Sequence, residues 1–187
     1  MLQNIFKDSI LVDTFVDKEF NNIIKDLLQK EKNNNKIINK SNVGGFHTQD
    51  IDNEFVINKL LFWTHKLILK DLYLNHKITI NLQNLWINEN LKNDYNQEHT
   101  HPGSSFSGVY YIEVPENSGN IYFKNDPKEF IELSSFFKNT EYDSHKEINN
   151  YNNQFILFPS NLRHGVYPNC SDKPRISVSF NIKITSA

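Results

Sequence analysis

NQEHTHPGSSFSGVYYIEV, residues 96–114, places two histidines two positions apart, directly before a Pro-Gly turn and a run of strand-forming residues. Side chains at positions i and i+2 of a strand share one face, so His99 and His101 could converge inside a barrel mouth. The pair could equally lie in a surface loop and bind nothing. A metal needs a third ligand, and His164, at the start of a later strand-like run, is the candidate. Such a triad would leave one face of an octahedron open to substrates.

Around this stretch, the chain divides into a helical front, residues 1–77, and a strand-rich part, residues 78–187. Helical spacing of apolar residues predicts helices over 17–33 and 51–74, after a short strand within 3–16, and a loop follows the first helix at 41–50. Six strands are predicted over 78–90, 107–114, 120–126, 154–160, 164–169 and 175–184. Residues 127–153 form a polar insertion that could be partly helical. We expect one α+β, mainly β domain over 1–187, with the N-terminal helices packed on one face of a sandwich or barrel.

Composition narrows the range of partners and compartments. A formal net charge of −2 gives no reason to expect nucleic acid as a partner. The single cysteine, Cys170, excludes an internal disulfide framework and suits a reducing compartment. No signal peptide is recognisable, and no apolar run reaches the roughly 20 residues of a membrane helix, so we expect a cytoplasmic protein without membrane contact. The apolar helix at 55–74 could pack on the barrel or on a second subunit, which leaves a homodimer possible.

The last predicted strand carries a polar face. Arg175 follows His164 by eleven residues and shares its strand face with Ser177 and Ser179. An arginine beside two hydroxyls suits a carboxylate, and Tyr111 on strand 107–114 could add a third hydroxyl. Taken singly, each residue has an ordinary alternative: a surface or interior histidine, or an arginine in a salt bridge. The remaining histidines show no partner spacing and are expected to lie outside the site: His47, His65, His76 and His145.

Several short motifs follow one another in a fixed order. They are W-x-N at 86–88, H-x-H-P at 99–102, S-G-V-Y-Y at 107–111, F-P-S-x-x-x-H-x-V at 158–166 and R-I-S-x-S-F-N at 175–181. In this combination the chain resembles the Fe(II)- and 2-oxoglutarate-dependent oxygenases, and most closely a bacterial and phage subgroup of them. SNVGGFH near residue 41 is similar to the N-terminal region of that subgroup. The resemblance covers roughly residues 41–184 and implies a double-stranded β-helix, the jelly-roll or cupin-like core.

The resemblance also implies roles for individual residues. His99 and His164 match the two metal-binding histidines, and Arg175 matches the basic residue that binds the distal carboxylate of 2-oxoglutarate. Tyr111 matches a tyrosine that hydrogen-bonds this carboxylate, while Ser177 and Ser179 compete for one hydroxyl position. Asn88 lies where a contact with cosubstrate or substrate is expected. The implied cofactors are Fe(II), 2-oxoglutarate and O2, and the implied catalytic set is His99, His164 and Arg175.

One position departs from the pattern, because His101 stands where the family usually has an aspartate or glutamate. Three neutral imidazoles leave both positive charges of the iron to be neutralised by the 2-oxoglutarate dianion. Glu98 or Asp126 could supply a carboxylate instead, but Glu98 has the opposite strand parity to His99 and Asp126 lies on a separate predicted strand, so neither is expected to replace His101. The expected function is a dioxygenase that hydroxylates a small-molecule or peptide substrate and releases succinate and CO2. The alternatives are a cupin-type metal-binding protein, a non-catalytic jelly-roll binding module and an inactive oxygenase fold.

Overall fold

The computed structural model describes residues 9–33, 40–72, 77–124 and 145–186, which contain two helices and eleven strands. The helices are α1 (Lys18–Asn33) and α2 (Glu54–Asp71). The strands are β1 (Leu11–Thr14), β2 (Asn42–Val43), β3 (Phe46–His47), β4 (Ile78–Asn90), β5 (Tyr95–His99), β6 (Phe106–Glu113), β7 (Ile121–Lys124), β8 (His145–Ile148), β9 (Gln154–Pro159), β10 (Arg163–Val166) and β11 (Arg175–Ser186). Neither helix is long and apolar enough to span a membrane.

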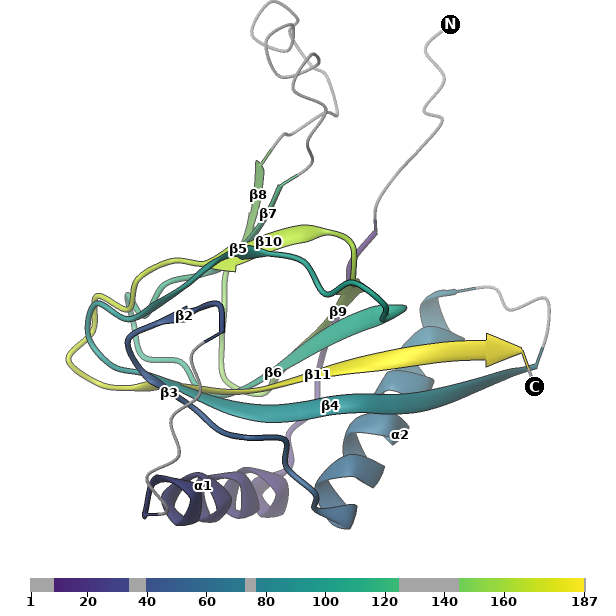
Figure 1. Ribbon diagram of the computed structural model, residues 1–187, viewed down its shortest axis with the longest axis horizontal. Coiled ribbons are helices and arrows are strands. Elements are labelled where there is room, and N and C mark those ends of the chain that lie inside the picture. Colours follow the sequence, from purple (N-terminus) through teal and green to yellow (C-terminus); the bar gives the residue numbers. More distant parts are fainter. Residues whose placement is uncertain (1–8, 34–39, 73–76, 125–144, 187) are drawn as a thin grey trace, which may run out of the picture.

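The strands form two antiparallel sheets. One sheet has the order β1-β9-β6-β11-β4-β3, and the other has the order β2-β5-β10-β7-β8. Both helices lie on the same side of the first sheet, beneath β4 and β11, while β5 and β10 of the second sheet lie on the opposite side (Figure 1). The predicted α+β, mainly β architecture with helices on one face is therefore confirmed.

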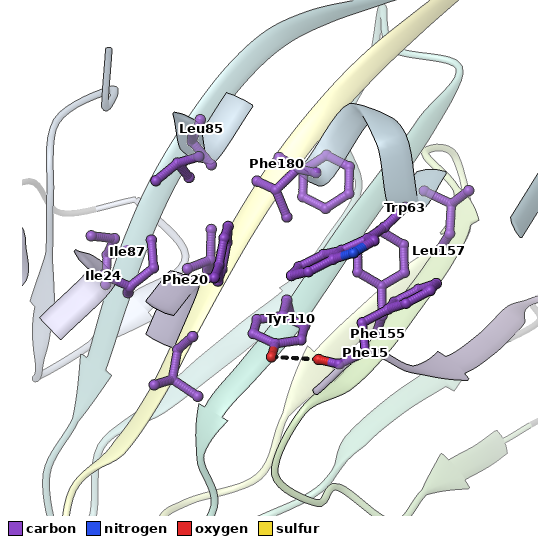
Figure 2. Close-up of a cluster of buried hydrophobic side chains, with 14 of the residues drawn as sticks. Phe15, Phe20, Ile24, Trp63, Leu85, Ile87, Tyr110, Phe155, Leu157 and Phe180 are labelled. Carbon is purple, nitrogen blue, oxygen red and sulfur yellow. Dashed lines mark hydrogen bonds between the residues drawn. The ribbon is translucent and has the colours of Figure 1, made fainter. Parts of the chain in front are cut away.

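The core beneath the first sheet fixes the helices to it. Alternate residues of β4, β6, β9 and β11 face the helices and form one apolar cluster with them. Trp63 of α2 stacks on Phe15 with a centroid separation of 5.1 Å, and the hydroxyl of Tyr110 donates to the carbonyl of Phe15 at 2.8 Å (Figure 2). Burying aromatic side chains on this scale stabilises the sheet that carries the polar residues on its other face.

The opposite face of the same strands borders the space between the sheets. Val109 and Tyr111 of β6 belong there, in a second, smaller apolar cluster. On β11, Ile176 and Val178 belong to the helix-side cluster, whereas Arg175 and its neighbours two and four residues on line an inter-sheet cavity. The alternation predicted for residues 175–179 is confirmed: the apolar side chains of this strand face the helices, and the polar side chains face the cavity.

Two segments that were predicted as a loop and as an insertion contain strands. Residues 41–50, expected as a loop, contain β2, which pairs with β5, and β3, which pairs with β4. Gly44 and Gly45, both at φ +68°, form the turn between them, a conformation that favours glycine. Within the predicted insertion 127–153, residues 145–148 form β8, which pairs with β7, and the expected partly helical stretch falls mainly on residues 127–144, outside the described part of the chain.

Candidate active site

Three histidines converge at one end of the inter-sheet space. His99 ends β5 and is the direct register partner of His164 on β10. His101 follows two residues later, and the nitrogen atoms that the three rings could offer to a metal all lie within 4.8 Å of one another. The ring centroids are 4.4 Å apart for His99 and His164 and 5.2 Å apart for His101 and His164. Three imidazoles at this separation can coordinate a single ion.

The route by which His101 reaches this cluster differs from the prediction. The two histidines were expected to share one face of a strand. Instead, β5 ends at His99, and His101 lies in the loop that follows. The backbone N–H of His101 donates to the carbonyl of Ser160 at 2.8 Å, and Pro102 has no N–H with which to continue a ladder. A loop contact, and not strand parity, brings His101 to the cluster.

Backbone hydrogen bonds fix the tautomers of two of these rings. Nδ1 of His99 donates to the carbonyl of Gln97 at 2.7 Å, and Nδ1 of His164 donates to the carbonyl of Leu162 at 2.9 Å. A carbonyl only accepts, so each Nδ1 carries the proton and each Nε2 keeps a lone pair for a metal. The ring of His101 makes no hydrogen bond to the described residues and lies 5.9 Å from the indole of Trp86.

Burial keeps the triad neutral. It lowers the pKa of His99, lowers that of His101 to about 4 with a smaller contribution from His99, and lowers that of His164 to about 3. A metal bound at neutral pH therefore displaces no protons from these rings. The site can therefore bind an ion without a protonation change in its ligands.

Arg175 is a buried cation without a carboxylate partner. Its side chain is 1% exposed, and Nη1 donates to the carbonyls of Ser118, Gly119 at 3.0 Å and Tyr167 at 3.3 Å. Nη2 is buried without a hydrogen-bond partner, and no aspartate or glutamate among the described residues forms an ion pair with it. Burial lowers the pKa of the guanidinium, opposed by the nearby Tyr111 and Asp94. An arginine nevertheless stays charged, so this group calls for an anion.

The histidines and Arg175 line the same cavity. The other residues predicted for the site line this cavity as well: Tyr111, Asn88, Ser177 and Ser179. The amide nitrogen of Asn88 donates to the hydroxyl of Ser179 at 3.1 Å, while its Oδ1 is buried without a partner. Burial raises the pKa of Tyr111 to about 12, so its hydroxyl stays protonated and can donate. The cavity therefore offers histidine lone pairs at one group of residues and an unpaired donor, Nη2 of Arg175, at another.

Neither carboxylate considered as a replacement for His101 is found at the cluster. The carboxylate of Glu98 is paired instead with Lys124 at 2.5 Å and Arg163 at 3.2 Å. The hydrogen bond from Lys124 is the main cause that lowers the pKa of Glu98. Asp126 lies outside the described residues. The metal-ligand cluster of the described chain thus consists of histidines only.

Some contributors were missed by sequence reasoning. Trp86 and Asn90 line the cavity two residues to either side of Asn88 on β4, and strand alternation could have found them. The carbonyls of Ser118 and Tyr167 hold Arg175 in place, but every residue carries a carbonyl, so no sequence signal marks them. His47, which was expected to have no role, lines a second cavity beside the histidines.

Comparisons with known proteins identify a family and a fold. The family model described as "Putative 2OG-Fe(II) oxygenase" matches residues 84–181, which hold all of the residues assigned above. No curated protein matches the chain. Among solved structures, the chain is similar to a Pseudomonas putida prolyl-4-hydroxylase, with a TM-score of 0.63 and 13% identity over 94% of this chain and 92% of that one.

Two further structures show the same fold. A viral collagen prolyl hydroxylase from Paramecium bursaria Chlorella virus-1, solved as a 2-oxoglutarate complex, has a TM-score of 0.60 and 15% identity, with coverage of 92% of this chain and 94% of that one. HygX from Streptomyces hygroscopicus, solved with nickel and 2-oxoglutarate bound, has a TM-score of 0.63 and 11% identity, with coverage of 94% of this chain and 83% of that one. The expected double-stranded β-helix is confirmed, and from its match over residues 84–181 the chain belongs to the family of 2-oxoglutarate- and Fe(II)-dependent oxygenases.

Proposed function

We propose that this oxygenase hydroxylates a C–H bond of a small-molecule or peptide substrate. In the balanced reaction, substrate, 2-oxoglutarate and O2 give hydroxylated substrate, succinate and CO2. The observation that carries the proposal is the unpaired guanidinium of Arg175 in the same cavity as three neutral imidazoles. A site that needs no keto acid has no use for a buried cation behind its metal ligands.

The histidine cluster suits Fe(II). His99 and His164 would each contribute Nε2, because their Nδ1 atoms are committed to backbone carbonyls, and His101 would complete the triad. Imidazole is a common ligand of non-haem iron, and three protein ligands leave coordination positions for cosubstrate and oxygen. Bound iron would supply the activation of O2 that no protein side chain can provide.

The other end of the cavity suits 2-oxoglutarate. Nη2 of Arg175 would donate to the distal carboxylate, and the protonated hydroxyl of Tyr111 would add a second donor. Ser177 or Ser179 would contribute one more hydroxyl, while Asn88 would contact cosubstrate or substrate. The dianion would place one carboxylate at Arg175 and the other at the metal, which would reduce the three positive charges of Arg175 and the iron to a net charge of +1. In this way the cosubstrate would replace the carboxylate that is missing at residue 101.

The direct experiment is an assay of 2-oxoglutarate consumption and succinate formation by purified protein in the presence of O2. Consumption that requires Fe(II) and produces succinate in equal amount supports the proposal. Zinc binding without any turnover of 2-oxoglutarate, in a folded protein, would favour a cupin-type metal-binding protein instead. Failure to bind either metal or 2-oxoglutarate would favour a non-catalytic binding module.

A further inference from the structure

A short segment of the chain forms a wall beside the histidine cluster. Residues 42–47 cross from one sheet to the other: β2 pairs with β5, the strand that ends at His99, and β3 pairs with β4, where His47 lies opposite Asn88. A second cavity of about 370 Å³ opens along this wall. It shares Trp86 and the first two histidines of the cluster with the first cavity, but Arg175 lines the first cavity alone. A substrate in this second cavity would lie beside the metal ligands without competing for Arg175.

His47 is held rigidly in this wall. Its backbone pairs with Asn88, and its ring stacks on the indole of Trp86 with centroids 5.5 Å apart and planes 9° apart. Nδ1 donates to the carbonyl of Thr48 at 2.6 Å, so Nδ1 carries the proton and Nε2 is the acceptor in the neutral ring. The pKa of His47 is lowered, chiefly by burial, so the ring is neutral at pH 7.

The fold makes no use of this acceptor. His47 is 3% exposed, and Nε2 forms no hydrogen bond with any described residue, although the residue lines the second cavity. A phenylalanine could stack on Trp86 equally well and would leave no unpaired acceptor facing the cavity. An acceptor held in place by a strand, a hydrogen bond and a stacked ring is therefore best explained by a donor that arrives with a ligand.

The surroundings restrict what that ligand can be. Apart from Trp86, the residues that line the second cavity are polar, and they include Lys40, Asn84, Gln97, Asn181 and Glu98, whose carboxylate is already paired with Lys124 and Arg163. Lys40 lies with Nζ 5.7 Å from the centroid of the Trp86 ring, and a cation here repels an ammonium group. A cavity of this volume and polarity suits a hydrophilic group of about the size of an amino acid, with a neutral O–H or N–H donor.

We propose that His47 is a substrate-binding residue whose Nε2 accepts a hydrogen bond from a hydroxyl or carboxamide donor of a hydrophilic substrate. This inference rests on the proposed function, since it concerns the substrate of the same oxygenase site. Serine, threonine, asparagine and glutamine side chains carry this chemistry, either in free amino acids or in peptides. Apolar side chains, the proline ring and the lysine ammonium do not.

The test measures 2-oxoglutarate consumption by the Fe(II)-loaded protein with two sets of probes. One set contains the free L-amino acids, and the other contains the corresponding N-acetyl amino acid amides, which mimic peptide residues. We expect at least one hydroxyl or carboxamide side chain to stimulate consumption, whereas leucine, phenylalanine, proline and lysine do not. Stimulation by the free or the capped form then separates a small-molecule source from a peptide source.

Two variants test His47 itself. His47→Phe keeps the stacked ring but removes the acceptor, and we expect the KM for the stimulating probe to rise at least 10-fold. His47→Gln keeps an acceptor oxygen and should restore the KM to within about 3-fold of wild type. The Kd for 2-oxoglutarate, measured on zinc-loaded protein without substrate, should stay within 2-fold in both variants. The matched control is His65→Phe, which alters an exposed histidine of α2.

A spectroscopic readout does not depend on turnover. In zinc-loaded protein with ¹⁵N-labelled histidine, Nε2 of His47 should have an unprotonated, pyridine-like shift that moves when the stimulating probe is added. A protonated Nε2, an unchanged KM in His47→Phe, preferential stimulation by apolar probes, or stimulation by none would each overturn the inference. If the wild-type protein neither consumes 2-oxoglutarate without substrate nor binds it, the result would instead count against the proposed function.

Discussion

Replacing Arg175 with methionine isolates the contribution of the buried guanidinium. The change removes the positive charge but keeps an unbranched apolar stem of similar length. In the wild type, Nη1 donates to the carbonyls beside this stem. Truncating one partner of a buried, hydrogen-bonded charge pair costs about 2–5 kcal/mol. The Kd for 2-oxoglutarate should therefore rise by roughly 30-fold to several-thousand-fold. Arg175→Lys, which keeps the charge but loses the planar fork, should give an intermediate loss.

Isothermal titration calorimetry with 2-oxoglutarate on zinc-loaded protein measures this effect without turnover. The matched control is Arg163→Met, because Arg163 is the other arginine of the chain and points outward toward Glu98. That variant should bind 2-oxoglutarate like the wild type, and all variants should bind the metal within about 3-fold. An Arg175→Met protein that is folded by circular dichroism and binds 2-oxoglutarate within 3-fold of wild type would refute the proposed role of Arg175.

Three further predictions concern the metal ligands and the core. His99→Ala or His164→Ala should lower Fe(II) affinity by at least 100-fold in equilibrium dialysis, while His101→Asp should bind better than His101→Ala, because a carboxylate can replace the imidazole. Burial holds the pKa of His101 and His164 below the ordinary 6.5, so the metal-free fold should be most stable above pH 6.5. As the pH falls below this value, the free energy of unfolding should decrease by up to about 1.4 kcal/mol per pH unit for each histidine. Urea denaturation at pH 7 and pH 5 measures this decrease. Tyr110→Phe removes the bond to the Phe15 carbonyl and should cost about 1–2 kcal/mol of unfolding free energy, without changing metal affinity.

Strand alternation made much of the site predictable. It assigned Arg175, Ser177 and Ser179 to one face of the last strand, and the structure has them on the wall of one cavity. The same rule, extended two residues on either side of Asn88, would have added Trp86 and Asn90. Period-2 patterns are reliable where a strand has one apolar and one polar face, because a shift by one residue would bury the polar side chains.

Contacts made by loops could not be predicted in this way. The convergence of His101 on the cluster depends on its backbone bond to Ser160, a residue far along the chain, and strand parity gave the wrong reason for it. The segment expected as a loop at 41–50 pairs with both sheets, yet each of its strands is only two residues long and leaves no periodic signal. His47 was set aside because its partners, Trp86 and Thr48, are defined by that pairing.

The central claim is that the three histidines hold Fe(II) in the same cavity in which Arg175 holds 2-oxoglutarate. An anaerobic titration of Fe(II)-loaded protein with 2-oxoglutarate, followed by visible absorption, tests it most directly. We predict a visible charge-transfer band that saturates at one equivalent and is absent in His164→Ala. No band in the folded wild-type protein, with Fe(II) demonstrably bound, would contradict the claim.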